Sequence, residues 1–415
     1  MRAVFLITLV AFGSFAQGRF DRTNQRTDQG RSKRGFLPQS GAFFEFAPAS
    51  GAGMGMACAG AAITGAKGEV VTVTRTSSAT CAPLGLATTG IANASLVEVG
   101  LNLPRVEAQS DGVLALRSEA AATNVCTRFI DYANAAWADV GTPTPTAGQT
   151  SPWVGTYASS AVQYDDNDGA AFEGRTQTVT VTAATAYTMS CFVKAGTLSS
   201  WTLSLDGTTA SGTGLSSTTW SLVSVTDASS SGVAIAAQIL NGSTAAATGT
   251  VVWGGCQVES GSLVSSMQPA AAAAATRNAE VPAVSGVSIA GLASTGCVRA
   301  YVSRPTGSTN GTAVSFSDSN GRPLYFTAGN QTVFDGTNNP NLATTFNSGA
   351  KWYITRWTGS TFTLHNQDTA AANTAFDGTM GVTGPLQIGY SVTNLNLGGL
   401  ISRIQLDPSP TRCTQ

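Results

Sequence analysis

The stretch from residue 253 to residue 277 constrains the organisation of the chain most, because it ends one β-structured region and begins the next. Residues 251–259 alternate in the period of two expected of a half-buried strand. One side of this strand would carry Val252, Gly254, Cys256 and Val258, and the other Val251, Trp253, Gly255, Gln257 and Glu259. Gly261 ends the strand, and Pro269 followed by six alanines predicts a spacer at 269–277. The sequence therefore predicts one β-domain that closes near residue 268 and another that starts at residue 278.

The composition predicts an all-β protein. Charged residues make up 11% of the chain, against about 25% in typical soluble domains, and 46 glycines accompany abundant threonine, serine and valine. Short strands rich in Thr and Val, separated by Gly-containing turns, are typical of β-sandwiches. A length of 415 residues allows two or three domains, and the Trp and Phe residues spread along the chain argue against disorder.

The N-terminal residues form two segments of contrasting character. Residues 1–16 combine a positive start, an apolar run and small residues at 14 and 16, which predicts a signal peptide; an uncleaved apolar anchor is the alternative. Residues 17–35 hold six basic and two acidic side chains, which predicts a flexible basic arm. Such an arm could contact an anionic surface or an acidic partner, but a solvated leader is the simpler interpretation and we expect no nucleic-acid partner. Residues 36–123 then form a small β region.

Several of the predicted strands resemble a family of tailed-phage and prophage structural proteins. Near the N-terminus the resemblance rests on Val71-Thr-Val-Thr-Arg-Thr, Asn102-Leu-Pro-Arg and Gly112-Val-Leu-Ala-Leu-Arg. Asn134-Ala-Ala-Trp, Val179-Thr-Val-Thr and Trp253-Gly-Gly-Cys-Gln-Val-Glu are similar to the carbohydrate-binding-module-like jelly roll of those proteins. Lys351-Trp-Tyr-Ile-Thr-Arg-Trp and Gly398-Gly-Leu-Ile-Ser-Arg are similar to their laminin-G or concanavalin-like sandwich. The resemblance spans residues 71–407 and implies tandem β-sandwiches: a jelly roll at 124–268, a linker at 269–277 and a laminin-G-like sandwich at 278–415.

The resemblance implies a non-enzymatic virion protein of the tail-fibre or head-fibre type. Its sandwiches would contact glycans on a host surface, and homo-oligomerisation or incorporation into a larger virion assembly is expected of such appendages. The predicted signal peptide favours an alternative, a secreted bacterial carbohydrate-binding protein. A secreted glycan hydrolase is a third hypothesis, but it would need a pair of carboxylates that the sequence does not offer.

Aromatic side chains are the predicted sugar-binding groups, because exposed rings stack on pyranose faces. The candidates in the predicted jelly roll are Trp153, Tyr157, Tyr164, Trp201 and Trp220, with Trp153 and Trp220 the strongest. The candidates in the last domain are Tyr325, Trp352, Trp357 and Tyr390. Trp137 and Trp253 are assigned to the core.

Acidic residues and the single histidine predict no catalytic site. The densest acidic group is Asp165, Asp166 and Asp168, which could hold a structural Ca²⁺, although an Asx-rich solvated turn is the simpler interpretation. No other cofactor is expected. The acids after residue 278 are isolated, and His365 has no nucleophile motif near it in the sequence.

Seven cysteines without a C-x-x-C spacing argue against a zinc ribbon. In an oxidising compartment they predict disulfides. Because the first and last strands of a jelly roll often lie side by side, the predicted pairs are Cys126–Cys256, Cys297–Cys413 and Cys58–Cys81, with Cys191 a buried thiol. In a reducing compartment all seven would instead be small core residues.

Overall fold

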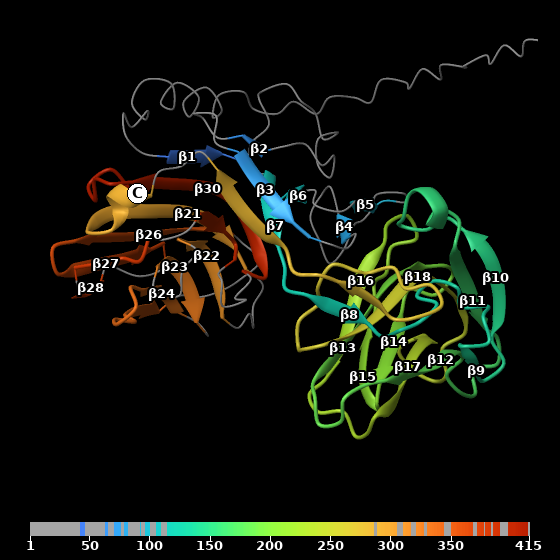
Figure 1. The fold of residues 1–415 in the computed structure, drawn as a ribbon. Helices are drawn as coiled ribbons and strands as arrows, with labels where there is room; N and C mark the ends of the chain where they lie inside the picture. Colours follow the sequence, from blue (N-terminus) through green and yellow to red (C-terminus); the bar gives the residue numbers. More distant parts are fainter. Residues whose placement is uncertain are drawn as a thin grey trace, which may run out of the picture. The chain divides into compact units, whose positions relative to one another are not determined.

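The computed structural model describes residues 42–45, 63–64, 70–75, 79–81, 92, 96–99, 105–108, 114–285, 289–304, 310–316, 321–327, 330–343, 350–367, 372–376, 378–382, 385–390 and 397–413. Within these ranges the chain is built from antiparallel strands and two 3₁₀ turns, and no α-helix occurs (Figure 1). The prediction of an all-β fold with tandem sandwiches is confirmed. The predicted signal peptide, the basic arm and Cys58 lie outside the described residues.

The first sandwich packs two five-stranded sheets around one core. One sheet has the order β10-β11-β18-β13-β16 and the other β15-β14-β17-β12-β9. The strands of the first sheet are β10 (Thr144–Gln149), β11 (Ala161–Asp166), β13 (Tyr187–Ala195), β16 (Ser221–Asp227) and β18 (Gly249–Ser260). Those of the second are β9 (Ala138–Val140), β12 (Gly174–Thr180), β14 (Trp201–Leu205), β15 (Thr208–Gly212) and β17 (Ala234–Asn241). Trp137 and Trp253 lie in this core, as predicted.

Strand β18 is buried on both faces, so the expectation of a half-buried strand is wrong. The turn residues around Pro152 and Trp220 fold back onto its outer side, and a Cβ on Gly254 would lie 2.7 Å from a ring atom of each. The pairing with β13 shifts register here, and Gly255 has a φ of 130°, a bulge conformation that side chains disfavour. The two glycines therefore allow loop residues to cover the outer face of this sheet.

The second sandwich consists of two larger sheets. One has the order β28-β27-β26-β21-β30-β7-β6, with β1 also paired to β30. Its strands are β1 (Ala42–Glu45), β6 (Val106–Ala108), β7 (Leu114–Ser118), β21 (Thr295–Ser303), β26 (Lys351–Thr358), β27 (Thr361–Asn366), β28 (Ala372–Ala375) and β30 (Gly399–Asp407). The alternation of side chains at 351–364, around the turn Thr358-Gly-Ser-Thr, predicts a hairpin. Strands β26 and β27 form this hairpin, and it places Trp357 and Phe362 in the core.

The opposing sheet has the order β2-β3-β20-β29-β22-β23-β24-β25. Its strands are β2 (Ile63–Thr64), β3 (Val70–Thr74), β20 (Val281–Ser285), β22 (Gly311–Ser315), β23 (Arg322–Thr327), β24 (Asn330–Phe334), β25 (Asn341–Ala343) and β29 (Leu386–Ile388). Strands from residues 42–118 thus extend both sheets of the second sandwich, through β7 and β1 on β30 and through β3 on β20.

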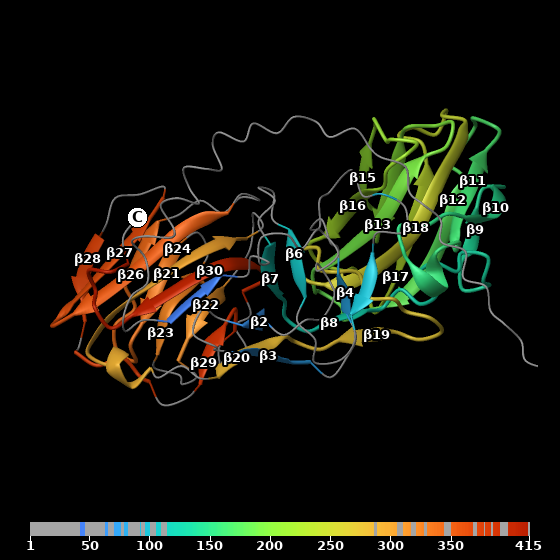
Figure 2. The same cartoon turned by 90° about the horizontal axis from the view of Figure 1, so that it is seen from above.

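Short strands also pair at the junction between the two sandwiches. Strand β8 (Ala122–Asn124) pairs with β19 (Ala275–Arg277), as Figure 2 shows, and β4 (Ala79–Cys81) pairs with β5 (Val97–Val99). Within the predicted linker, Ala270 is buried and its carbonyl accepts a hydrogen bond from the amide of Phe129. None of the described residues forms a helix long and apolar enough to cross a membrane.

Two disulfides join strands inside the sandwiches. Cys297 on β21 is bonded to Cys413, which confirms that predicted pair. The predicted pair Cys126–Cys256 is wrong, because Cys256 is bonded to Cys191, its direct register partner on β13. Cys126 is instead a buried free thiol. The structure does not describe the side chain of Cys81, so the predicted Cys58–Cys81 pair lies outside the described residues.

Peptide mapping of the unreduced protein should find Cys191 linked to Cys256 and Cys297 linked to Cys413. The bridges close loops of 65 and 116 residues. In the chain-entropy model, reduction of either one should lower the free energy of unfolding by about 4 to 5 kcal/mol. Cys126→Ala is the control and should leave both linked peptides in place. A peptide that links Cys126 to Cys256 would contradict the assignment.

Candidate functional site

The strongest predicted sugar-binding residues lie in the core. Trp153 and Trp220 are 1% and 0% exposed, and Tyr164 is equally buried. The Trp153 indole donates to the carbonyl of Gly254 and makes an edge contact with Phe192. Burial raises the pKa of Tyr164 to about 12. The expectation that these three rings face solvent is wrong, because the loops that carry the two tryptophans fold back over the β18 sheet.

Tyr157 and Trp201 keep part of their surface in solvent. Tyr157 packs edge-on against Phe129 and Trp153, so its ring belongs to the same covered face. Trp201 lies at the start of β14, where its ring covers Gly212. A sugar-binding role for these two residues stays a prediction.

The three aspartates after Tyr164 do not converge. Asp165 pairs with Thr250 in the β11–β18 ladder, a carboxylate oxygen of Asp166 accepts the amide of Glu173, and Asp168 caps the amide of Ala170. Burial raises the pKa of Asp166. The described residues contain no group of three or more His, Cys, Asp or Glu side chains placed to hold a metal ion.

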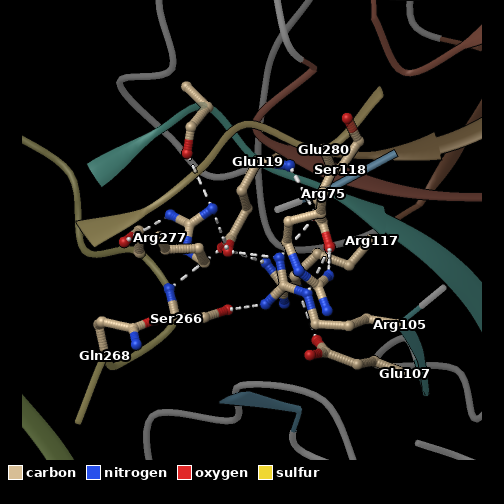
Figure 3. A network of polar contacts seen from close by, with 12 residues as sticks. Arg75, Arg105, Glu107, Arg117, Ser118, Glu119, Ser266, Gln268, Arg277 and Glu280 are labelled. Carbon is tan, nitrogen blue, oxygen red and sulfur yellow. Dashed lines mark hydrogen bonds and ion pairs between the residues drawn. The ribbon is translucent and has the colours of Figure 1, made fainter. Parts of the chain in front are cut away.

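A buried cluster of charges lies among the described residues, and sequence reasoning did not find it. Figure 3 shows its members side by side. The Glu280 carboxylate accepts from Arg75 at 2.6 Å and takes both Nε and Nη2 of Arg105, at 2.7 and 2.6 Å. Arg105 also donates to Ser266 at 2.6 Å and to Glu119 at 2.8 Å. We call this set, together with Glu107, Arg117 and Arg277, the charge cluster.

Glu119 is the second acceptor of the charge cluster. It lies 3.2 Å from Arg117 and 3.4 Å from Arg277, and the backbone amide of Ser266 donates to it. Burial alone would raise the pKa of Glu119, but these arginines and Arg105 hold it well below its usual range. Arg117 in turn donates to Glu107 at 2.5 Å.

The charge cluster is a structural joint, because its charged groups are directed at one another and away from solvent. Buried, paired charges cost little only while every partner is present. The sequence did carry a signal. Arg75, Arg105, Arg117 and Glu119 lie in the three N-terminal motifs of the phage resemblance, or within two residues of them, and Arg277 follows the alanine run. Nothing in the sequence says that these residues meet, because Arg105 and Glu280 are 175 positions apart.

Two partly exposed aromatic residues of the second sandwich lie on the outer face of the sheet that contains β26, β21 and β30. Trp352 on β26 and Tyr301 on β21 are direct register partners, and their ring centroids are 5.0 Å apart. Both are partly exposed. Strand alternation produces this arrangement, since Tyr353 and Trp357 point into the core from the other side of β26.

Basic side chains surround this aromatic pair. The Arg299 guanidinium carbon lies 3.7 Å from the centroid of the Trp352 ring. Arg403 on β30 is the register partner of Tyr301, and His365 on β27 is that of Ile354. We call Arg299, Tyr301, Trp352, His365 and Arg403 the outer-face patch; all five side chains are partly exposed.

The remaining predicted aromatics of this domain do not join the patch. Trp357 is buried and donates to the carbonyl of Leu292, and the hydroxyl of the buried Tyr325 contacts Asn339. Tyr390 is partly exposed. Trp352 is therefore the one predicted aromatic that stands in the patch.

The outer-face patch is held on central strands. Near Cys297, the C-terminal segment covers the outer face of the sheet. Arg356 donates to the carbonyl of Cys413 and Gln405 to that of Arg412, while Asp407 accepts from the amide of Ser409. The Cys297–Cys413 disulfide fixes this segment. The side chains of the patch consequently extend from a rigid support, as a binding surface requires.

The unfolding free energy should depend on the titration of Glu259, which is buried next to the charge cluster. Burial raises its pKa to about 6, although hydrogen bonds from Ser265 oppose the shift. Because the pKa of Glu259 is higher in the folded protein than the unfolded value of 4.5, protonated Glu259 favours the folded state. Its contribution to the free energy of unfolding is complete below pH 4.5 and is lost as the pH rises through 6.

Glu259→Gln removes this titration. Relative to the wild type, the unfolding free energy of the variant should rise by about 2 kcal/mol between pH 4.5 and pH 7.5, measured by urea unfolding. Asp168→Asn, at an exposed carboxylate, is the matched control and should show little such change. A difference between Glu259→Gln and wild type that is constant with pH would contradict the prediction.

No protein-family model matches the chain, and no curated protein matches it either. Among solved structures, the N-terminal CBM22-1–CBM22-2 tandem domain of Xyn10C from Paenibacillus barcinonensis is similar over 70% of this chain and 99% of its own. The sequence identity is 10% and the TM-score is 0.26. So low a TM-score carries no argument about what this chain binds.

Proposed function

We propose that this protein is a non-enzymatic glycan-binding protein and that the outer-face patch is its binding surface. The observation that carries the proposal is the cross-strand pair of Trp352 and Tyr301 on a rigid, partly exposed sheet face. Sugar rings present C–H faces that stack on aromatic side chains, while polar neighbours recognise the hydroxyls. Arg299, Arg403 and His365 supply such neighbours within the same patch.

The engagement of the buried acids supports a binding role over hydrolysis. Glycoside hydrolysis needs two carboxylates that face the scissile bond. Glu107, Glu119 and Glu280 are each directed at arginines in the charge cluster. Glu173, also buried, accepts from the amide and hydroxyl of Thr142. These carboxylates are committed to holding strands together.

The glycan-binding protein would be part of a phage virion appendage or, alternatively, a protein that a bacterium secretes. The resemblance in strand motifs supports the virion appendage, which would be homo-oligomeric or built into a larger assembly. The two disulfides favour an oxidising compartment, and thus an extracellular protein.

Intact mass of the protein from its native source should decide between the two settings. Purified particles that contain the chain would support the virion appendage. A chain that begins at Gln17, found free in culture medium, would support the secreted protein and contradict the virion role.

Trp352→Ala should weaken glycan binding by about 5- to 30-fold, because stacking on an aromatic ring contributes on the order of 1 to 2 kcal/mol. A glycan array identifies ligands of the full chain, and calorimetry then measures the affinity of the best one. The matched control is Trp201→Ala, a partly exposed tryptophan of the first sandwich. If only Trp201→Ala weakens binding, the first sandwich is the binding domain. Absence of any glycan ligand for the intact chain would refute the proposed function.

A further inference from the structure

We infer that the outer-face patch recognises an acidic glycan, through contact of Arg299 with a carboxylate or sulfate group on the sugar. The inference rests on the proposed function and specifies its ligand class. Its starting point is the position of Arg299 beside the aromatic pair. The ring of Trp352 lies against the guanidinium of Arg299, and no carboxylate of the described residues does.

Among the residues that the structure describes, Arg299 has no acidic partner. Its two register neighbours are Ile354 on β26 and Gln405 on β30, both neutral. The Nε of Arg299 is buried and makes no hydrogen bond. Of the described charged groups, Arg403 is the one that acts on the Arg299 guanidinium, and it repels it. Burial and this repulsion lower the pKa of Arg299.

The other charges around Arg299 are directed elsewhere. Asp407, two positions from Gln405 on β30, accepts from the amide of Ser409 and lies 3.6 Å from Arg412. Arg356 donates to the carbonyl of Cys413. On the far side of β30, β1 places Glu45 at the register position of Arg403 and Phe43 at that of Gln405. The β1 register partners of Arg403 and Gln405 are thus Glu45 and Phe43, and neither is a register partner of Arg299.

The geometry of an arginine stacked on an indole suits an anionic sugar. A guanidinium that packs on a ring keeps its in-plane N–H donors for a carboxylate or sulfate, which it can bind through two parallel hydrogen bonds. The same contact would use the terminal N–H donors of Arg299, since its Nε is buried, and would offset the repulsion between Arg299 and Arg403. A neutral sugar could stack on Tyr301 and Trp352 but would leave the charge of Arg299 uncompensated. Charge complementarity thus favours uronate, sialate or sulfated glycans over neutral ones.

The test compares matched glycans on the full chain. An array presents pairs that differ only in a carboxylate, such as a galacturonate oligomer and its galactose counterpart, and pairs that differ only in a sulfate. We expect the acidic member of at least one series to bind about 10- to 100-fold more tightly, since hydrogen bonds to charged groups are the stronger class. The two series distinguish a carboxylate ligand from a sulfate ligand. Raising the salt concentration should reduce the difference.

Arg299→Gln should bring the acidic and neutral members of the preferred pair to nearly equal affinity. Arg299→Lys keeps the positive charge but loses the planar pair of N–H donors, so it should retain part of the difference in affinity. The matched control is Arg322→Gln on β23, an arginine that stacks on Tyr325 and Phe334 in the opposite sheet of the same sandwich. It should keep the preference. If Arg299→Gln does not fold, the comparison of acidic with neutral ligands on the intact chain still decides.

Three results would overturn the inference. Equal binding of neutral and acidic partners, with affinity lost in Trp352→Ala, would leave the glycan-binding function in place and remove the acidic specificity. An acidic preference that survives in Arg299→Gln and disappears in Arg322→Gln would locate the anion site elsewhere. Binding of no glycan at all would refute the inference together with the function on which it rests.

Discussion

The bifurcated pairing of Glu280 with Arg75 and Arg105 is the interaction on which the joint between the sandwiches depends. Each of these three side chains is almost wholly buried, and an unpaired charge at such a depth costs several kcal/mol. Arg105 can stay charged there only if residues near 280 and 119 are folded around it. The charge cluster therefore requires segments from distant parts of the chain to assemble together. Strands before residue 119 also pair with strands after residue 280, so the ladders and the cluster join the same segments.

That assembly also supports the outer-face patch. Strand β30 pairs with β7 and β1 on one side and with β21 on the other, and β21 carries Arg299 and Tyr301. The Cys297–Cys413 bridge fixes the same strand to the C-terminal segment. Side chains on such central strands lose little further freedom when a ligand binds, so more of the contact energy contributes to affinity. The patch thus owes its rigidity to contacts far from it in sequence.

Local patterns in the sequence predicted the local structure well and the long-range contacts poorly. The alternation at 351–364 gave the correct hairpin, and Trp137 and Trp253 were correctly assigned to the core, because a period of two reports which face is apolar. Trp153 and Trp220 were misjudged because Ser, Gly and Thr around them are typical of exposed loops. Only the fold shows that these loops cover a sheet, and no local pattern reports that. The predicted partner of Cys256 was wrong for the same reason, since the order of strands in the sheet decides whether Cys126 or Cys191 lies opposite Cys256.

Arginine occupies two contrasting environments in this chain, and the contrast bears on function. A chain with 11% charged residues has few charges to place, and within the charge cluster every arginine has an acidic or carbonyl acceptor. Arg299 is half-buried under the same desolvation but has an aromatic ring in place of an acceptor. Stability alone would favour a neutral residue at this position, because a partly desolvated cation beside Arg403 opposes folding. In the role inferred above, an anionic ligand would supply the counter-charge that the described residues do not, so the same residue that weakens the free protein would strengthen the complex.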